Sequence, residues 1–151
     1  MKALTICQPY AHLIVQGRKT CENRTWPTNY RGPIYIHAGK SRTWLDVWNR
    51  GGEDFDAGYE IPIRSMAFGA VVAMAELVAC INIESRLLPE WKAKMTEDQQ
   101  EHVSGPWCWI LANVAPIGPW PWRGEQGLFE IDPDELGKVA NRELGIEAPQ
   151  A

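Results

Sequence analysis

The sequence predicts an α+β domain built on a small, strongly bent sheet or open β-barrel with short flanking helices. Five or six short segments have strand-like patterns, short amphipathic segments lie between them, and the strand expected at 68–80 is nearly all apolar from Ala70 to Ala75. Because 151 residues suffice for one core and no linker or repeat interrupts them, we expect a single domain over 1–145 and a disordered tail at 146–151.

The first 50 residues predict three strands and two helices. Tyr10, Leu13 and Ile14 have the i, i+3, i+4 spacing of an amphipathic helix, and Gly17 suits the left-handed residue that ends one. Gly32 suits a tight turn. The expected order is a strand at 3–7, a helix from Pro9 to Gln16, a strand through Glu22 and Arg24 that ends at Pro27, a strand at 33–38, and a helix from Ser41 to about Asn49.

The rest of the chain predicts a long buried strand and a proline-rich connection. Residues 50–62 are rich in glycine and acidic residues and are expected to form a mobile loop. Residues 116–122 contain too many prolines for a paired strand and are expected to cross the surface as an extended connection. The expected elements are strands at 68–80, 107–114 and 128–131, a short helix capped by Thr96, and a helix from Asp132 to Leu144.

Charge is distributed unevenly along the chain. The net charge is −4, but residues 1–50 carry eight basic and two acidic residues, a net +6, whereas 51–151 carry a net −10. A net-acidic protein is poorly suited to binding a long duplex, although a local basic patch can hold one or two phosphates. A nucleotide, or a short single-stranded or flipped-out segment, is therefore the favoured ligand, unless folding mixes the two parts.

The sequence lacks the features that are typical of several classes of protein. No apolar run approaches the ~20 residues that span a bilayer, and no export signal begins the chain, so we expect a cytoplasmic protein without membrane association. The cysteines are scattered, without a CxxC or a nearby histidine pair, which argues against a zinc site or a disulfide framework. The common enzyme fingerprints are also absent, and we expect no cofactor or metal.

The segment 17–24 is the centre of the candidate site. A side-chain period of two places Thr20, Glu22 and Arg24 on one face of a strand, and Lys19 in the preceding turn can fold back toward them. Three charged groups would then converge beside a tryptophan. The alternative is a solvated strand start with a surface ion pair, which stabilises little.

The remaining candidates have the residue types that bind nucleotides. Aromatic rings stack on bases, Gln and Glu read base edges, and Arg and Lys hold phosphates. Glu76 interrupts an apolar strand, so its carboxylate must be paired or face a cavity. Alternatively, Gln8 satisfies the amides of a helix start and the aromatic candidates belong to the core. The ligand-binding candidates are Gln8, Lys19, Glu22, Arg24, Trp26, Tyr30, His37, Lys40, Glu76, Trp109 and Gln126, with Trp26, Tyr30 and Trp109 as stacking rings.

Four sequence pieces in a fixed order cover roughly residues 3 to 131. They are Ile6-Cys7-Gln8-Pro9-Tyr10-Ala11, then Gly17-x-Lys19-x-x-Glu22-x-Arg24, then Tyr30-Arg31-Gly32-Pro33 with Ile36-His37-Ala38-Gly39-Lys40, and finally Gly124-x-Gln126-Gly127-Leu128-Phe129. Together these motifs resemble the ASCH family. The resemblance implies a PUA-like fold, which is a small bent sheet or open barrel, and binding of RNA or other nucleic acid.

The resemblance also implies that the chain could be a hydrolase, because some small relatives resemble amidohydrolases that act on N4-acetylcytidine. Lys19 matches their site lysine, but Glu22 stands where they have a nucleophilic threonine, and Thr20 and Thr25 are out of register. The catalytic residues would then be Lys19 and Glu22, acting through an activated water.

RNA cleavage and protein binding are two further functions that these residues leave open. Metal-independent RNA cleavage, suggested for other relatives, would use Lys19, His37 or Tyr30 as acid/base groups. A protein-interaction module would instead use the proline–tryptophan run at 116–122 as its adhesive patch. If the charged segment binds a ligand, Lys19→Ala, Glu22→Ala and Arg24→Ala should each impair binding and leave the fold largely intact.

Overall fold

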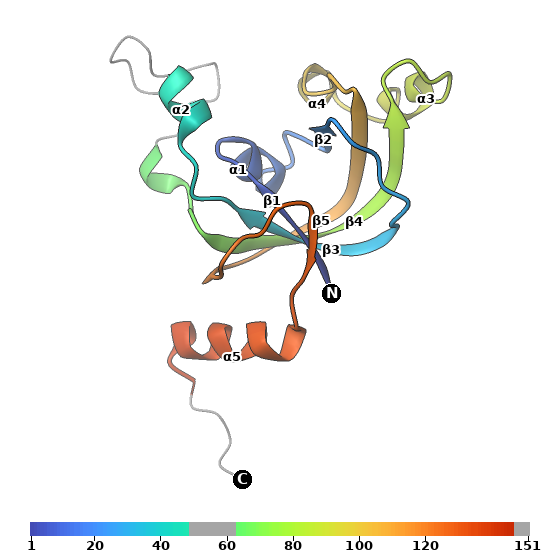
Figure 1. Cartoon of the computed structure of the whole chain (residues 1–151). Helices are drawn as coiled ribbons and strands as arrows, with labels where there is room; N and C mark the ends of the chain where they lie inside the picture. The colour runs from blue at the N-terminus through green and yellow to red at the C-terminus, as the bar shows by residue number, and fades with distance from the viewer. Residues whose placement is uncertain (49–62, 147–151) are drawn as a thin grey trace.

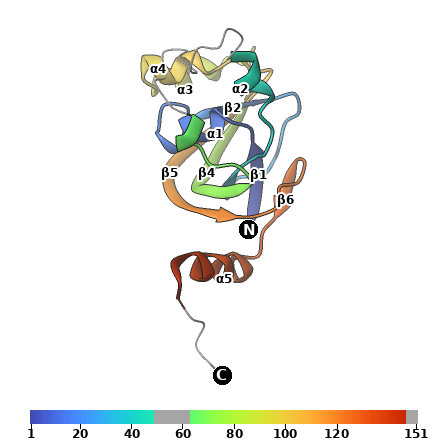
Figure 2. The same ribbon diagram turned by 90° about the vertical axis from the view of Figure 1, so that its left-hand side faces the viewer.

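The computed structural model describes residues 1–48 and 63–146, with the side chains of 46–48 excepted. In this part of the chain a six-stranded sheet curls around α1 (Tyr10–Val15), while α5 (Pro133–Leu144) lies against its other side (Figures 1 and 2). The strands are β1 (Lys2–Ile6), β2 (Cys21–Arg24), β3 (Gly32–Ala38), β4 (Ala70–Asn82), β5 (Trp107–Pro121) and β6 (Leu128–Glu130). The other helices are α2 (Thr43–Trp48), α3 (Leu88–Lys92) and α4 (Glu97–Glu101). The α+β class with a bent sheet is thereby confirmed.

The sheet has the strand order β2-β5-β4-β3-β1-β6, and only the β1–β3 pair is parallel among the described strands. The register of β4 on β5 shifts at three places between Val71 and Ala79. Such irregularities bend the paired strands and increase their twist. They explain how two long strands wrap around one side of the molecule.

The predicted loop at 50–62 lies outside the described residues, and so does the predicted tail at 146–151 apart from its first residue. The helix before the tail is confirmed: Asp132 accepts a hydrogen bond from the amide of Asp134, and Gly145 ends α5 with a φ of 70°. No helix in the described ranges is long and apolar enough to cross a membrane.

The expectation that 116–122 is an unpaired connection is wrong. β5 continues to Pro121 and pairs with β4, with Pro116 opposite Ala73 and Trp120 opposite Val71. β2 pairs only with the first part of β5, from Trp107 to Ile110. Beyond it β5 is an edge strand in the described fold, where a proline is tolerated when its nitrogen faces away from the neighbouring strand.

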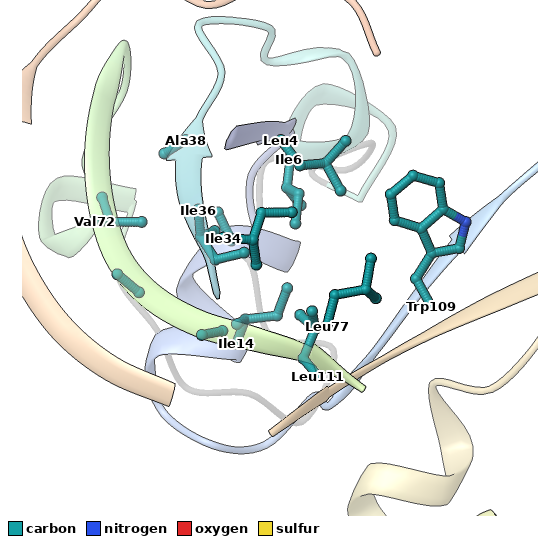
Figure 3. Packing of buried hydrophobic residues seen from close by; sticks show 13 residues of the cluster. Leu4, Ile6, Ile14, Ile34, Ile36, Ala38, Val72, Leu77, Trp109 and Leu111 are labelled. Carbon is teal, nitrogen blue, oxygen red and sulfur yellow. The ribbon is translucent and has the colours of Figure 1, made fainter. Parts of the chain in front are cut away.

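The main core fills the inside of the curled sheet. Side chains of α1 and of β1, β3, β4 and β5 point toward one another there (Figure 3). Trp109 is fully buried, donates its indole N–H to the carbonyl of Trp26 at 3.2 Å, and meets the Trp26 ring edge-on at 4.6 Å. This corrects the assignment of Trp109 as a base-stacking ring, because its side chain is fully buried; Trp26 is half-buried and packs against the same core.

A second apolar cluster lies on the other side of the sheet, under α5. It joins Tyr35, Val71 and Phe129 to Leu136 of the helix. Since Val72 belongs to the main core, the start of β4 is buried on both faces, as its apolar sequence predicts. Glu76 follows in β4 between two buried residues, yet it is exposed. The expectation that the Glu76 carboxylate must be paired or face a cavity is wrong, because the side chain is exposed to solvent and needs no protein partner.

We expect the two tryptophans Trp109 and Trp44 to differ sharply in their contribution to stability. Trp109→Ala should lower the free energy of unfolding by about 3–5 kcal/mol, because it empties a large fully buried site. Trp44→Ala, at a side chain that is 47% exposed, should lower it by only about 1 kcal/mol through loss of one aromatic contact. Urea titration of both variants measures the difference, and equal losses would contradict this description of the core.

Candidate functional site

A cleft of about 710 Å³ opens between α1, α2, β1, β2 and the α4–β5 connection. It is lined by the basic Lys19, Arg24 and Lys40 and by the acidic Glu22 and Glu101. The other lining residues are Thr5, Cys7, Tyr10, Asn23, Gly39, Ser41, Trp44, His102 and Ser104. Four of the predicted site residues, Lys19, Glu22, Arg24 and Lys40, therefore meet in one place.

The end of α1 positions Lys19. Gly17 has a φ of 75°, its amide donates to Ile14, and the amide of Arg18 donates to Leu13 at 2.9 Å. This is the Schellman pattern that a glycine after a helix predicts. It reverses the chain just before β2 begins, so that the Lys19 side chain lies beside the strand rather than within its alternation.

The three charged groups converge as the strand register predicts. Lys19 Nζ lies 3.9 Å from Glu22 Oε1, and Arg24 Nη2 lies 4.0 Å from Glu22 Oε2. Lys19 is only 2% exposed and also donates to the carbonyl of Cys21. Arg24 donates from Nη2 to the carbonyl of Thr5 at 2.6 Å. Because Lys19 and Glu22 are buried, they do not form a solvated surface ion pair.

Two polar atoms of this charged cluster lack a hydrogen-bond partner within the described part of the chain. Glu22 Oε2 and Arg24 Nε are both buried, and neither has a hydrogen bond. An unsatisfied buried polar atom costs about 1–3 kcal/mol. Since both residues line the cleft, a ligand that brings a donor for the Glu22 oxygen would remove part of that cost.

Two aromatic side chains at the cleft were not among the predicted site residues. The rings of Tyr10 and Trp44 meet edge-on at 6.2 Å, and Trp44 is 47% exposed. Lys19 Nζ lies 5.6 Å from the centre of the Tyr10 ring. In the sequence, Trp44, Leu45 and Trp48 have the spacing of an apolar helix stripe, which predicts a core position for Trp44. Only the packing of α2 beside α1 shows that it faces the cleft instead.

Gln8 and Tyr30 have structural roles. Gln8 is 1% exposed, accepts from the amide of His12 and donates to the carbonyl of Ala67. This is the structural role expected for a polar residue at a helix start. The Tyr30 hydroxyl donates to the carbonyl of Pro33, and its ring packs against the main core. The structure therefore places both outside the cleft lining.

His37 and Gln126 line a second cavity of about 410 Å³ beside the cleft. His37 is 1% exposed, and its Nε2 donates to the carbonyl of Trp122 at 2.7 Å, since a carbonyl can only accept. Its Nδ1 then accepts from the hydroxyl of Thr5 at 3.1 Å. Burial, and to a lesser degree the charge of Lys40, lower the pKa of His37. The ring is neutral at pH 7, and both nitrogens are engaged.

Cys7 and His102 also line the cleft, although neither was among the predicted site residues. Burial and the charge of Glu22 raise the pKa of the Cys7 thiol, so it stays protonated at neutral pH. Burial and the charge of Lys19 lower the pKa of His102. Among the residues that the structure describes, no group of three or more His, Cys, Asp or Glu side chains could hold a metal ion.

The three histidines predict a decrease in stability at mildly acidic pH. The folded pKa values of His12, His37 and His102 all lie below the ordinary value of 6.5, chiefly through burial. The unfolded chain therefore binds protons first as the pH falls, and stability is lost below about pH 6.5. Urea unfolding between about pH 7.5 and 5.5 should show this loss. His37→Gln should reduce the slope, by at most about 1.4 kcal/mol per pH unit. An unchanged slope in the variant would contradict a buried neutral His37.

Comparison with known proteins was consistent with this fold. The crystal structure of an ASCH protein from Zymomonas mobilis is similar with a TM-score of 0.53 and 18% identity, over 93% of each chain. Two variants of that protein, a tyrosine-to-phenylalanine and a serine-to-alanine substitution, each give a TM-score of 0.51 and 17% identity over 93% of this chain, and cover 96% and 94% of their own chains. At this identity the likeness shows the fold alone. A search of curated proteins found no match.

The family itself is shown by the sequence. The model of the ASCH domain matches residues 4–121, most of the chain. ASCH domains are generally RNA-binding or hydrolase-like. The fold and this match agree with the motifs around Lys19 and Glu22. The chain belongs to the ASCH domain family.

Proposed function

We propose that this ASCH domain binds RNA or another single-stranded nucleic acid, with one base inserted in the cleft. The observation that carries the proposal is the buried Glu22 Oε2, which has no hydrogen-bond partner among the described residues, in a cleft whose lining includes an exposed tryptophan and an exposed lysine. A carboxylate accepts from the N–H groups on a base edge. A base that reaches Glu22 would satisfy this oxygen.

The surrounding side chains suit the rest of a nucleotide. Trp44 presents an aromatic surface on which a base can stack, which contributes about 1–3 kcal/mol. Lys40 is exposed at the cleft and can pair with a phosphate. The basic side chains that line the cleft all come from the first third of the chain, whereas most acidic residues lie later in the sequence. A short single-stranded ligand matches this local charge better than a duplex.

Glu22→Gln should weaken binding of a fluorescein-labelled, mixed-sequence RNA hexamer by about 10- to 100-fold, since a hydrogen bond to a charged group contributes about 1.5–3 kcal/mol. The substitution keeps the shape of the side chain but removes the charge beside the buried Lys19, so circular dichroism and urea unfolding must first show that the variant is folded at the assay temperature. Fluorescence anisotropy measures the affinity.

The matched control for this test is Glu76→Gln, which removes the same charge from the exposed side of β4. It should leave the affinity unchanged. If the two variants bind equally well, or if only Glu76→Gln weakens binding, the cleft is not the nucleic-acid site. Binding should also decrease as salt is raised.

A hydrolase is the second candidate, favoured by the buried pair of Lys19 and Glu22 at 3.9 Å. In such a reaction Glu22 takes a proton from water as the water oxygen attacks the carbonyl carbon of an N4-acyl cytidine. The Lys19 ammonium stabilises the resulting oxyanion. The carbon–nitrogen bond then breaks, and the proton passes to the leaving amine.

If the chain is a hydrolase, it should release acetate from N4-acetylcytidine. Chromatography measures the cytidine that is formed. Lys19→Met should abolish this release, whereas Lys94→Met, at an exposed lysine that lies over the Trp91 ring, should not. Absence of product from the wild-type protein would exclude this activity and leave the binding proposal intact. The ribonuclease and protein-interaction hypotheses have weaker support, because His37 has both nitrogens engaged and the charged motif is buried.

A further inference from the structure

The cleft adjoins the second cavity. Thr5, Gly39 and Lys40 line both spaces, so the two are neighbours across the end of β3. The second cavity, at about 410 Å³, has the size of a small-molecule site. The sequence motifs suggested one site that holds His37, Gln126 and Lys19 together, whereas the structure places His37 and Gln126 in an adjoining space.

Lys40 is held at the boundary between the two spaces. Its alkyl chain packs against Gly69, where an added Cβ would lie 2.7 Å from Lys40 Cε. Gly69 also has a φ of 64°, which other residues adopt at a cost. The absence of a side chain at Gly69 therefore leaves room for the alkyl chain of Lys40. The exposed Lys40 ammonium is available to a ligand group that bridges the cleft and the second cavity.

The connection between β5 and β6 forms the far wall of the second cavity. At Gly124 it approaches β1 and β3 so closely that a Cβ would lie 2.8 Å from Thr5 Oγ1 and 2.7 Å from His37 Cε1. Pairing of β6 with β1 holds the connection from its other end. Arg123 projects from this wall as an exposed cation, with Glu125 as the acidic residue of the same lining.

The floor of the second cavity carries no charge. His37 is buried and neutral, with one nitrogen donating to Trp122 and the other accepting from Thr5. The positive charge is thus confined to Lys40 at one end and to Arg123 on the wall. An uncharged, buried ring in a cavity that two cations also line suits a base or sugar with a phosphate beside it. Gln126 adds an amide that can donate to and accept from a base edge.

We propose that the second cavity is the subsite for a neighbouring nucleotide, with the phosphodiester between the two nucleotides held by Lys40 and a second phosphate contact from Arg123. The inference rests on the proposed function of the cleft and narrows it. The ligand is an oligonucleotide of two or more nucleotides rather than a free nucleoside.

The test has two parts: competition by ligands of different length, and removal of the Arg123 charge. Unlabelled equimolar mixtures of the four ribonucleoside monophosphates, or of the sixteen ribodinucleotides, compete with the labelled RNA hexamer for the full chain. Dinucleotides should compete about tenfold better than mononucleotides, because they occupy both subsites. Arg123→Gln should weaken hexamer binding several-fold and reduce the slope of log K against log salt by about 0.7, the value for one contact to a single strand.

Arg142→Gln is the matched control, because Arg142 is an exposed arginine of α5 that lines neither cavity. It should change neither the affinity nor the salt slope. Two results would overturn the second subsite: equal competition by mono- and dinucleotides, or an unchanged salt slope in Arg123→Gln. If Glu22→Gln still weakens binding in that case, the proposal for the cleft itself stands. A wild-type chain that does not bind the hexamer at all would overturn both the cleft proposal and this one.

Discussion

The burial of the Lys19 ammonium next to the Glu22 carboxylate is the constraint on which the rest of this site depends. Removing a charge from water costs several kcal/mol unless partners compensate it. Here the carbonyl of Cys21 and the carboxylate of Glu22 lie next to the ammonium, at 2% exposure of the lysine. The geometry requires a sharp helix end at Gly17 and a strand that begins immediately afterwards. The spacing Gly17-x-Lys19-x-x-Glu22-x-Arg24 satisfies both requirements.

Local features of the fold could be predicted because they depend on neighbours in the sequence. The cap at Gly17, the caps of α5 and the convergence of Lys19 with Glu22 follow from backbone preferences and the strand period. Features that depend on packing between residues far apart in the sequence could not be predicted in this way. Trp109 has the same local pattern as a stacking residue, and only the pairing of β5 with its neighbours shows that it is buried.

The same distinction applies to the site. Trp44 faces the cleft because α2 packs near α1, and its periodicity alone suggests a core residue. The prolines at 116–122 indicate a surface connection, yet they are accommodated on the free edge of β5. His37 has the residue type of an acid/base group, but its two hydrogen bonds make it part of a cavity floor. In each case the tertiary partner decides the role of the side chain.

The most direct test of this account is a two-dimensional ¹H–¹⁵N NMR titration of the chain with the unlabelled RNA hexamer. We expect the largest amide shifts at Thr5, at Lys19, at 22–24 and at Lys40, because these residues line the proposed binding surface. The amides around Glu76 and along α5 should not move. Shifts confined to α5 or to the outer side of β4, with no change at Glu22, would contradict the central claim that the cleft binds nucleic acid.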